Sequence, residues 1–458
     1  MIDPILSLSP LDGRYRSKVE DLADYYSEFG LNKYRVRVEI EWLIFMANNL
    51  KLPNTNKLTD LETKFLREVE SYFDIVSGQR VKEIEQTTNH DVKAIEYYIK
   101  EALEPSNLKH LVEFVHLGCT SEDINNTAYA LMVKEGFHNK ILPQINQLIE
   151  LLVALAETEK TTPMLSLTHG QSATPTTLGK EIINVVARLE TILTKMKEFK
   201  FTGKWNGAVG NHSAMSASGL NENWIEISKQ FLGELGLEPN LFTTQIEPHD
   251  NLAEFLNYQT QINTILIDFA RDAWSYVSRD IFKQKLKDGE IGSSTMPHKV
   301  NPIDFENAEG NLGISSALAQ HLSIKLPISR MQRDLSDSTT LRNLGLVFGY
   351  HFLSVASLIK GVQKLEVNHE KLNAELDQNP EVLGEAVQSA MRVAGIEKPY
   401  EKLKELTRGK KITLKDLQDF IKKLELEETV KNNLLALTPQ SYIGEAVNLV
   451  DYYLKNRK

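Results

Sequence analysis

Apolar residues recur at intervals of three and four along much of the chain, the spacing that places side chains on one face of an α-helix. Two such stripes comprise Ile141, Ile145, Leu148, Leu152 and Leu155, and Ile182, Val186, Leu189, Leu193 and Met196. A third extends from Leu252 to Tyr276, and no proline or glycine interrupts the chain between Pro248 and Gly289. The sequence therefore predicts a third helix approaching about 40 residues, or about 60 Å at a rise of about 1.5 Å per residue.

These stripes are amphipathic, so each helix is expected to pack against others. We predict an all-α fold with an N-terminal helical domain (1–112), a central bundle of long helices that contains a glycine-bearing loop (113–364) and a C-terminal helical domain (365–458). Strand signals are scarce and short. In the last domain, Thr413 followed by Asp416 is typical of a helix start, and residues 409–411 (GKK) predict a polar loop.

The composition is that of a soluble globular protein. The chain of 458 residues is 41% hydrophobic and 25% charged, and its length allows about three domains of ordinary size. The net charge of −10 argues against a general nucleic-acid surface, because such surfaces concentrate lysine and arginine. A locally basic pocket for a small anion is compatible with this charge.

Features that would direct the chain out of the cytoplasm are missing from the sequence. Cys119 is the only cysteine, which excludes an internal disulfide and indicates a reducing compartment. The opening residues (MIDPILSLSPLDGRY) lack the basic segment and apolar run of a secretory signal. No stretch approaches about 18 uninterrupted apolar residues, the length of a membrane span. We expect a cytoplasmic protein that does not enter a membrane.

Polar segments interrupt the helical periodicity at four places. They are residues 87–91 (TTNHD), 116–123 (HLGCTSED), 168–175 (THGQSATP) and 289–302 (GEIGSSTMPHKVNP). Polar, glycine-bearing loops on a rigid helical scaffold are common positions for binding and catalytic groups. These segments are therefore the first candidates for a functional site.

Residues 289–302 combine flexible glycine, two hydroxyls, a cation and an amide in Gly292, Ser293, Ser294, Lys299 and Asn301. Such a loop is suited to close over a small anionic ligand and to exclude water. A plain surface turn is the alternative, with Pro302 as the start of the next helix.

His169 lies among small polar residues, and an imidazole with an ordinary pKa of about 6.5 exchanges a proton at neutral pH. A structural or merely exposed histidine is the alternative, and the same alternative applies to His90 and His116. In the run Asn89-His90-Asp91, the Asp91 carboxylate would lie near the His90 imidazole if the adjacent side chains pointed the same way.

A fifth segment follows residue 329 and carries Arg330, Arg333 and Arg342 together with several hydroxyls. Guanidinium groups bind phosphate and carboxylate oxygens in bidentate fashion, so this cluster suits either group. The alternative is a solvated helix end in which Asp334 and Asp337 pair with the arginines.

Several other chemistries have no support. The sequence has no phosphate-binding G-x-x-x-x-G-K-[ST] loop, and residues 207–210 (GAVG) do not fit the dinucleotide-binding pattern. An H-E-x-x-H motif and paired cysteines are absent, which disfavours a dedicated zinc site. A G-x-S-x-G elbow is also absent, so nothing supports a hydrolase nucleophile of that type.

Residues 292–301 (GSSTMPHKVN) resemble the G-S-S-x-M-P-x-K-x-N motif of the fumarase/aspartase superfamily, and the order of the other polar segments agrees with that resemblance. Within the superfamily, residues 12–15 (DGRY), 243–249 (TTQIEPH) and 330–343 resemble the adenylosuccinate lyases of the longer bacterial type. This resemblance covers nearly the whole chain. The chain departs from the family in one motif. Many members have R-T-H-G-Q-P-A-T-P, whereas this chain has Leu167 before the threonine and Ser172 after the glutamine.

The resemblance implies an all-helical, three-domain subunit that forms a homotetramer, with each active site built from three subunits. It implies two reactions of purine synthesis, adenylosuccinate to AMP and SAICAR to AICAR, each releasing fumarate. The expected partners are these small molecules and further copies of the chain, with no cofactor, metal, nucleic acid or membrane.

By matching position, the resemblance implies His169 as the general acid and Ser293 as the general base. Lys299 is the nearby cation, and it either stabilises an ionised serine or holds a substrate carboxylate. The substrate-binding residues implied in the same way are Arg14, Tyr15, Asn89, His90, Asp91, His116, Thr120, Ser121, Gln245, Ser294, Lys299, Val300, Asn301, Asn307, Arg333, Ser338 and Arg342.

Three other functions stay open at the level of sequence. The shared loop does not distinguish adenylosuccinate lyases from argininosuccinate lyase, aspartase or fumarase, although the arginine cluster favours a phosphate-bearing substrate. A non-catalytic protein of the crystallin type is disfavoured by Ser293, His169 and Lys299. A helical scaffold or binding module would leave the polar segments unexplained.

Overall fold

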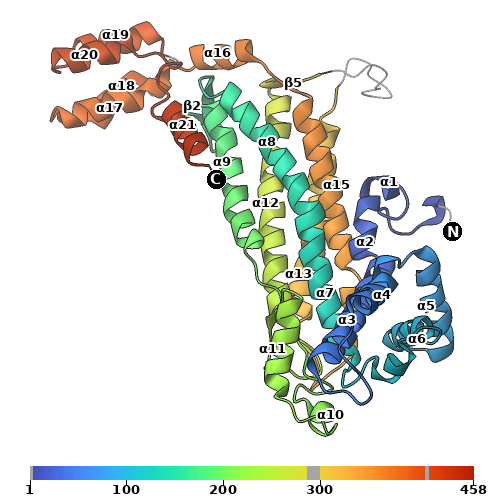
Figure 1. Ribbon diagram of the computed structural model, residues 1–458. Coiled ribbons are helices and arrows are strands. Elements are labelled where there is room, and N and C mark those ends of the chain that lie inside the picture. The colour runs from blue at the N-terminus through green and yellow to red at the C-terminus, as the bar shows by residue number, and fades with distance from the viewer. Residues whose placement is uncertain (1–3, 286–299, 408–411, 458) are drawn as a thin grey trace. The chain divides into compact units, whose positions relative to one another are not determined.

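The computed structural model describes residues 4–285, 300–407 and 412–457, and nearly all regular structure in them is helical (Figure 1). The chain forms two compact units. The first unit comprises Met1–Ile145, Ile192–Ile267 and Ala308–Ala356, and the second comprises Asn146–Thr191, Asp268–Asn307 and Ser357–Lys458. The predicted all-α class is confirmed. The domain boundaries expected at residues 112 and 364 stay a prediction.

The N-terminal part of the first unit is a group of helices around α3. Its elements are η1 (Pro4–Leu6), α1 (Arg16–Val19), η2 (Glu20–Leu22), α2 (Ala23–Tyr26), α3 (Glu28–Asn49), α4 (Asp60–Ser71), α5 (Ile75–Thr88), α6 (Asp91–Leu103), η3 (Lys109–Phe114), α7 (Ser121–Gly136) and the π-helical turn η4 (Phe137–Ile141). Helix α3 is buried along most of its length. Its Trp42 stacks on Phe45 and packs against Trp205 and Phe231, which fixes α3 in the core.

Long helices α8 (Leu142–Thr158), α9 (Leu178–Lys197), α12 (Asp250–Ser278), α13 (Ile303–Lys325) and α15 (Leu344–Gln363) each contribute to both units. Within the first unit, a buried polar cluster ties three of them together. Asn263 of α12 donates to Ser315 of α13 at 2.9 Å and contacts Nδ1 of His351 on α15 at 2.7 Å. Helices α12 and α15 accordingly lie side by side in Figure 1.

The predicted helical stripes are confirmed for α8 and α9. Ile145, Leu148 and Leu152 are fully buried, and so are Val186 and Leu189. The third helix is shorter than predicted, because α12 covers 29 residues and ends at Ser278.

The end of α12 has a local cause that periodicity does not reveal. Asp280 adopts a left-handed φ of 61°, and the N–H of Ile281 donates to the carbonyl of Tyr276 at 2.9 Å. This arrangement stops the helix and directs Phe282 into the strand β5 (Phe282–Gln284), which pairs antiparallel with β6 (Leu365–Val367).

The segment expected as a loop around His169 is instead a β-hairpin. Strand β1 (Pro163–Thr168) pairs antiparallel with β2 (Gln171–Thr177), and Thr168 lies opposite Gln171. The two turn residues, His169 and Gly170, have φ values of 55° and 72°. Two successive positive φ angles are those of a type I′ turn, which matches the twist of the strands.

The remaining elements of the first unit are short apart from α11. They are β3 (Thr202–Gly203), α10 (Ser213–Ser216), α11 (Trp224–Glu234), β4 (Glu238–Pro239), which pairs parallel with β3, and α14 (Ser336–Leu341). Helix α13 follows Pro302 directly, and the Phe305 N–H donates to the Pro302 carbonyl at 3.1 Å. The helix start predicted at Pro302 is therefore confirmed.

The C-terminal part of the second unit has its own core. Its elements are α16 (His369–Asp377), η5 (Pro380–Leu383), α17 (Gly384–Val393), α18 (Pro399–Thr407), α19 (Leu414–Lys422), α20 (Glu428–Ala436) and α21 (Ala446–Asn456). Val387, Met391, Leu417 and Ile421 are among the buried residues of that core. Thr413 and Asp416 cap each other's backbone N–H at the start of α19, as predicted. The polar loop predicted at 409–411 lies outside the described residues.

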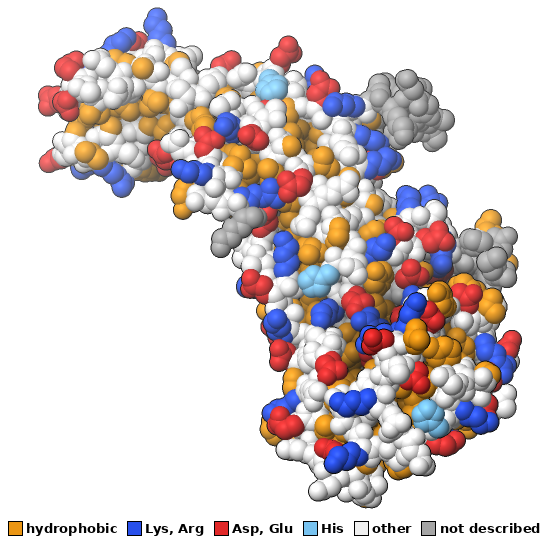
Figure 2. All heavy atoms as spheres, in the orientation of Figure 1, with side chains coloured by type: hydrophobic (Ala, Val, Ile, Leu, Met, Phe, Trp, Pro, Cys, Tyr) orange, Lys and Arg blue, Asp and Glu red, His pale blue; other side chains and the backbone are white. Residues whose placement is uncertain are grey.

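Charge and apolar length add two observations. Basic and acidic side chains are interspersed over the face drawn in Figure 2. The stretch Ser336–Gln363 is long and apolar enough to cross a membrane, but 67% of its most apolar window is buried within the protein. Such burial is typical of a core helix of a soluble protein.

Candidate active site

The start of helix α7 is held by one buried carboxylate. Asp123 accepts the N–H of Thr120 at 2.8 Å through Oδ2, and its Oδ1 lies 2.6 Å from Nζ of Lys204. The N–H groups of Asn206 and Gly207 donate to the same Oδ1 at 3.1 and 3.2 Å. Asp123 therefore joins the helix start that carries Thr120 and Ser121 to residues 204–207.

Arg333 is anchored beside this helix start. Its Nη1 lies 3.0 Å from Oε1 of Glu122, which follows Ser121, and the Arg333 side chain is 15% exposed. Asn125 donates to the same Glu122 oxygen at 2.8 Å. The structure therefore places Arg333 beside the helix start that carries Thr120 and Ser121.

Arg342 and Asp91 form a second ion pair between predicted site segments. Oδ2 of Asp91 accepts from Arg35 at 2.7 Å and from Arg342 at 3.0 Å, and Arg342 also donates to Glu28 at 2.6 Å. Burial of Asp91 favours its neutral form, but Arg35, the Val92 N–H and Arg342 together outweigh that effect and hold the pKa of the carboxyl below its ordinary value. Asp91 is consequently a fixed anion that orients Arg342.

One set of ion pairs and hydrogen bonds links the Arg333–Glu122 pair to the Arg342–Asp91 pair. Arg35, which is 1% exposed, donates to Asn125 at 2.9 Å as well as to Asp91. The resulting arginine–carboxylate network consists of Arg342, Asp91, Arg35, Asn125, Glu122 and Arg333. It fixes two predicted phosphate-binding arginines on one framework within the first unit.

Asn89 and His90 lie where α5 ends and α6 begins. Asn89 has a left-handed φ of 53° and ends α5, while Nδ1 of His90 accepts the N–H of Lys93 at 3.1 Å and caps α6. His90 and Asp91 lie near each other but are not hydrogen-bonded, because Nδ1 of His90 and Oδ1 of Asp91 are 3.9 Å apart. Asp91 is paired with arginines, and His90 remains about half exposed.

His116 pairs with a buried acid that the sequence does not single out. Its Nδ1 lies 2.5 Å from Oε1 of Glu39 on α3, and the Glu39 side chain is fully buried. Burial lowers the pKa of His116, but Glu39 outweighs burial and the pKa of the imidazole is raised. His116 is therefore biased toward its cationic form.

Gln245 and Ser338 belong to the same part of the first unit. The Gln245 N–H donates to the carbonyl of Gln332 at 3.2 Å, which joins residues 243–249 to the arginine segment. Ser338 lies in the short α14, where its N–H donates to Asp337 at 2.7 Å. Asp337 lies 3.6 Å from His249, and the charge of Arg333 also acts on its carboxylate. Among the described residues, a direct ion pair between an aspartate and an arginine that both belong to this segment forms only between Asp334 and Arg330.

Arg14 and Tyr15 lie in a turn in which Tyr15 donates its N–H to the Pro10 carbonyl at 2.9 Å. Tyr15 packs on the cluster of Leu11, Tyr350 and Leu353, and the Arg14 guanidinium lies 5.8 Å from the Tyr15 ring centre. Packing on α15 thus orders this N-terminal segment.

The other predicted site residues belong to the second unit. His169 is exposed at the hairpin turn and has no hydrogen-bond partner among the described residues. The carbonyl of Val300 accepts from Gln284 at 3.1 Å, and Asn307 accepts from Ser357 at 2.9 Å. Asn301 follows Val300 directly and is partly buried. Ser293, Ser294 and Lys299 lie outside the described residues.

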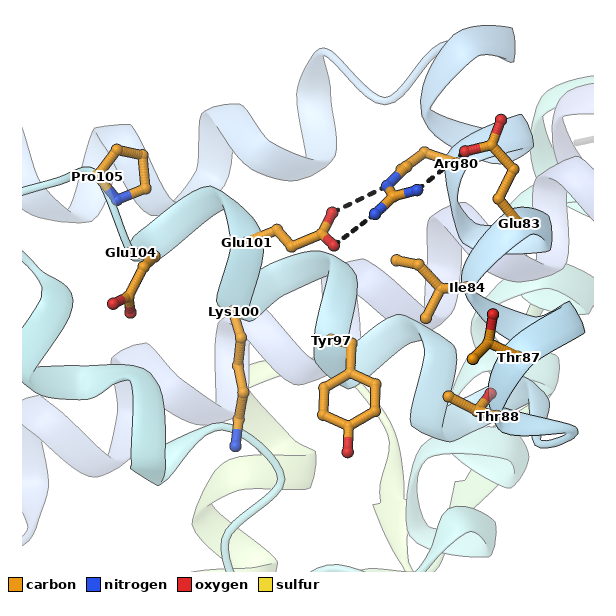
Figure 3. Close-up of a pocket in the computed structure, with 10 residues that line it drawn as sticks. All are labelled: Arg80, Glu83, Ile84, Thr87, Thr88, Tyr97, Lys100, Glu101, Glu104 and Pro105. Atoms are coloured by element: carbon orange, nitrogen blue, oxygen red, sulfur yellow. Dashed lines mark hydrogen bonds and ion pairs between the residues drawn. The ribbon is translucent and has the colours of Figure 1, made fainter.

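A separate surface cavity of about 770 Å³ lies between α5 and α6 (Figure 3). Arg80 spans it with ion pairs to Glu83 and Glu101, and Thr87 and Thr88 lie at one end. None of the predicted site residues lines this cavity. Within the described ranges, no group of three or more histidine, cysteine or acidic side chains is placed to hold a metal ion.

Sequence reasoning placed Glu122 and Asp123 in the polar segment 116–123, but it assigned no role to the residues that hold the site in place. They are Glu28, Arg35, Glu39, Glu122, Asp123, Asn125 and Lys204. The spacing of Thr120 and Asp123 is a helix-start signal and would have indicated Asp123. The others give no local signal, because their partners are distant in sequence.

Two protein-family models match this chain. Residues 13–314 match the family model described as Lyase, and residues 329–443 match the model described as adenylosuccinate lyase C-terminal. The chain is 50% identical over 451 residues to the adenylosuccinate lyase of Haemophilus influenzae, covering 98% of this chain and 99% of that one. The Escherichia coli adenylosuccinate lyase shows the same identity and coverage.

Solved structures share the fold at low identity. A fumarate lyase from Mesorhizobium is 17% identical with a TM-score of 0.75, covering 96% of this chain and 98% of that one. A 3-carboxy-cis,cis-muconate lactonizing enzyme from Pseudomonas putida is 18% identical with a TM-score of 0.71, covering 95% and 96%. Near-complete coverage at half identity, together with both family models, shows that the chain belongs to the adenylosuccinate lyase family of the fumarase/aspartase superfamily.

Proposed function

We propose that the chain eliminates fumarate from adenylosuccinate to give AMP, and from SAICAR to give AICAR. The observation that carries this proposal is the half identity over essentially the full length of relatives named adenylosuccinate lyase. The arginine–carboxylate network adds a physical reason, because it fixes Arg333 and Arg342 for a phosphate-bearing substrate. The alternatives of another superfamily lyase or a crystallin-like protein are not favoured.

The reaction removes a proton next to a carboxylate and expels an amine from the adjacent carbon. Ser293 is the proposed base, and His169 is the proposed acid that protonates the departing nitrogen. A serine hydroxyl is a weak base, so its ionised form requires amide donors, positive charge and exclusion of water. Lys299 is the proposed nearby cation, or it holds a carboxylate of the succinyl group.

The position of His169 supports its role as the acid. His169 is exposed at the type I′ turn, and no described residue occupies either ring nitrogen. An imidazole that is free of internal partners can approach a substrate and deliver a proton without first breaking a protein contact.

The succinyl carboxylates are assigned to the start of α7 and to the loop. Thr120 and Ser121 lie at a helix N-terminus, where backbone N–H groups and the helix dipole favour negative charge. Ser294, Lys299, Val300 and Asn301 complete this proposed end of the site. The buried ion pair of Asp123 and Lys204 holds the start of α7 in place while the bound substrate is converted into products.

The phosphate and ribose end is assigned to Arg333, Ser338 and Arg342, with Arg14 and Tyr15. A guanidinium has five N–H donors, so each arginine can keep its internal carboxylate on one edge and bind phosphate with the other. We assign the orientation of the base and ribose to Asn89, His90, Asp91, Gln245 and Asn307. His116 is assigned to bind an anionic group of the substrate.

We further propose a cytoplasmic homotetramer in which three subunits build each site. Helix α13 leaves Ile303, Ile314 and Ile324 exposed, at 55%, 45% and 69% of their area. Several exposed isoleucines on one long helix favour coverage by another copy of the chain. Its partners are small anionic substrates; neither nucleic acid nor a membrane is proposed.

A substrate panel tests the assignment. Purified protein is offered adenylosuccinate, SAICAR, argininosuccinate, aspartate and malate, and fumarate is measured in each case. Fumarate from the first two alone is the expected result. Release from argininosuccinate, aspartate or malate with none from adenylosuccinate would reject the proposed substrate.

A further inference from the structure

Helix α3 holds both the ring and the backbone at His116. Glu39 contacts Nδ1 of the imidazole at 2.5 Å, and Trp42, one turn further along, donates its indole N–H to the Leu117 carbonyl at 3.1 Å. His116 has a left-handed φ of 64°, which is uncommon for a residue with a side chain. The surrounding contacts must therefore maintain this conformation.

The pairing with Glu39 determines what the other ring nitrogen can do. An ionised carboxylate only accepts hydrogen bonds, so Nδ1 of His116 carries a proton. In the neutral ring, Nε2 would then carry an unshared electron pair, which repels an anion. In the cationic ring, Nε2 carries a second proton and attracts one. Among the described residues none occupies Nε2, and the His116 side chain keeps 19% exposure.

Glu39 is the acid that faces His116 without a cation of its own. Glu96 on α6 and Asp123 on α7 also act on the His116 imidazole. Glu96 is engaged by Lys93 and Lys100, and Asp123 is engaged by Lys204. Oε2 of Glu39 is buried and has no hydrogen-bond partner within the described part of the chain, so His116 is the only group that balances this carboxylate.

We propose that Glu39 is a positioning residue that keeps His116 protonated and presents Nε2–H to an anionic oxygen of the substrate. Binding of the anion is then linked to the proton on His116. The inference rests on the proposed function for the identity of the anion, which is either the phosphate or a succinyl carboxylate. Glu39 itself touches neither.

The test uses Glu39→Gln in the full-length protein, because glutamine keeps the size and one acceptor but removes the charge. AMP is the probe for a phosphate contact, and fumarate is the probe for a carboxylate contact. At neutral pH we expect the affinity for one of the two probes to fall by at least about tenfold, the usual range for a lost charge-assisted hydrogen bond. Glu41→Gln is the matched control, since Glu41 lies on the same helix and pairs with Arg67 at the surface.

A structural role is separated from a positioning role by two further readouts. In a His116→Gln background, Glu39→Gln should cause no further loss of affinity. In the unmodified protein, affinity for the responsive probe should fall as the pH rises through the raised pKa of His116, and this component should be missing in His116→Gln. The pH dependence, compared between the unmodified protein and His116→Gln, remains decisive if Glu39→Gln does not fold.

The outcomes distinguish this inference from the proposed function. Loss of AMP affinity alone assigns His116 to phosphate, and loss of fumarate affinity alone assigns it to a carboxylate. Wild-type protein that releases fumarate, with Glu39→Gln binding both probes normally or His116→Gln keeping the full pH dependence, overturns the inference only. Wild-type protein that binds neither probe overturns both.

Discussion

Lys204 and Asp123 form an ion pair of 2.6 Å in which neither side chain exceeds 1% exposure. A charge removed from water is costly unless its partner and hydrogen bonds are in place. Asp123 meets this condition with the Lys204 ammonium and three backbone N–H groups, from Thr120, Asn206 and Gly207. The pair therefore fixes the start of α7, where substrate carboxylates are proposed to bind.

Lys204→Met should destabilise the protein by about 3–5 kcal/mol, because it leaves the Asp123 charge buried and uncompensated. Thermal unfolding of wild-type and variant protein measures the effect. Lys229→Met is the control, since Lys229 pairs with Glu226 at the surface with 44% and 62% exposure and should cost less than about 1 kcal/mol. Equal unfolding temperatures for both variants would contradict a supporting role for Lys204.

His169→Ala should fold normally and lose about 100- to 10,000-fold in turnover, because a general acid is removed from an exposed turn without breaking an internal contact. Fumarate release is measured beside the unfolding temperature. His110→Ala, at an exposed histidine outside the proposed site, should match the wild type in both. Turnover by His169→Ala near the wild-type rate would remove this residue from the mechanism.

Arg342→Gln should weaken binding of AMP by about 10- to 100-fold while leaving fumarate binding nearly unchanged, since a charge-assisted contact to phosphate is lost. Equilibrium binding of the two products separates these effects. Arg330→Gln provides the control, because Arg330 belongs to the same segment but is 85% exposed. An unchanged AMP affinity in Arg342→Gln would place the phosphate elsewhere.

Gly170→Ala should reduce turnover more than stability. A Cβ at Gly170 meets no atom within 4 Å, so the φ of 72° is the source of strain. That strain is about 1 kcal/mol and acts on the turn that presents His169. Gly384→Ala is the matched control, because its Cβ also meets nothing and no positive φ is required. Identical kinetics for the two variants would show that the turn conformation does not govern His169.

Mixing His169→Ala with Ser293→Ala should restore part of the activity if each site draws these residues from different subunits. Hybrid tetramers then contain some sites with both groups intact. Subunit exchange is first verified with differently tagged chains, and fumarate release is then measured. No recovery after complete exchange would contradict shared sites.

The helical stripes could be predicted because apolar spacing is a local property. Val186 and Leu189 of α9 are buried as expected. The same pattern overestimated α12, since the left-handed Asp280 ends the helix although no proline or glycine does so. The hairpin at His169 was missed because its strands are short and carry few strand-forming residues on the turn side.

The proposed catalytic and binding residues could be identified from motifs, but the residues that support them could not. Glu39 and His116 are 77 residues apart, and Lys204 and Asp123 are 81 apart. In sequence, Glu39, Arg35 and Lys204 look like ordinary charged positions on helices or strands. Only the folded chain shows that they are buried, that Glu39 and Arg35 hold the predicted site residues His116 and Asp91, and that Lys204 holds Asp123.

The most direct test of elimination by this chain is the stoichiometry of its products. Purified protein is incubated with adenylosuccinate, and fumarate and AMP are quantified over time. We predict equal amounts of both products, formed at a rate that falls by at least about 100-fold in Ser293→Ala. Folded protein that forms no fumarate, or a Ser293→Ala variant as fast as the wild type, would contradict the proposed reaction or its base.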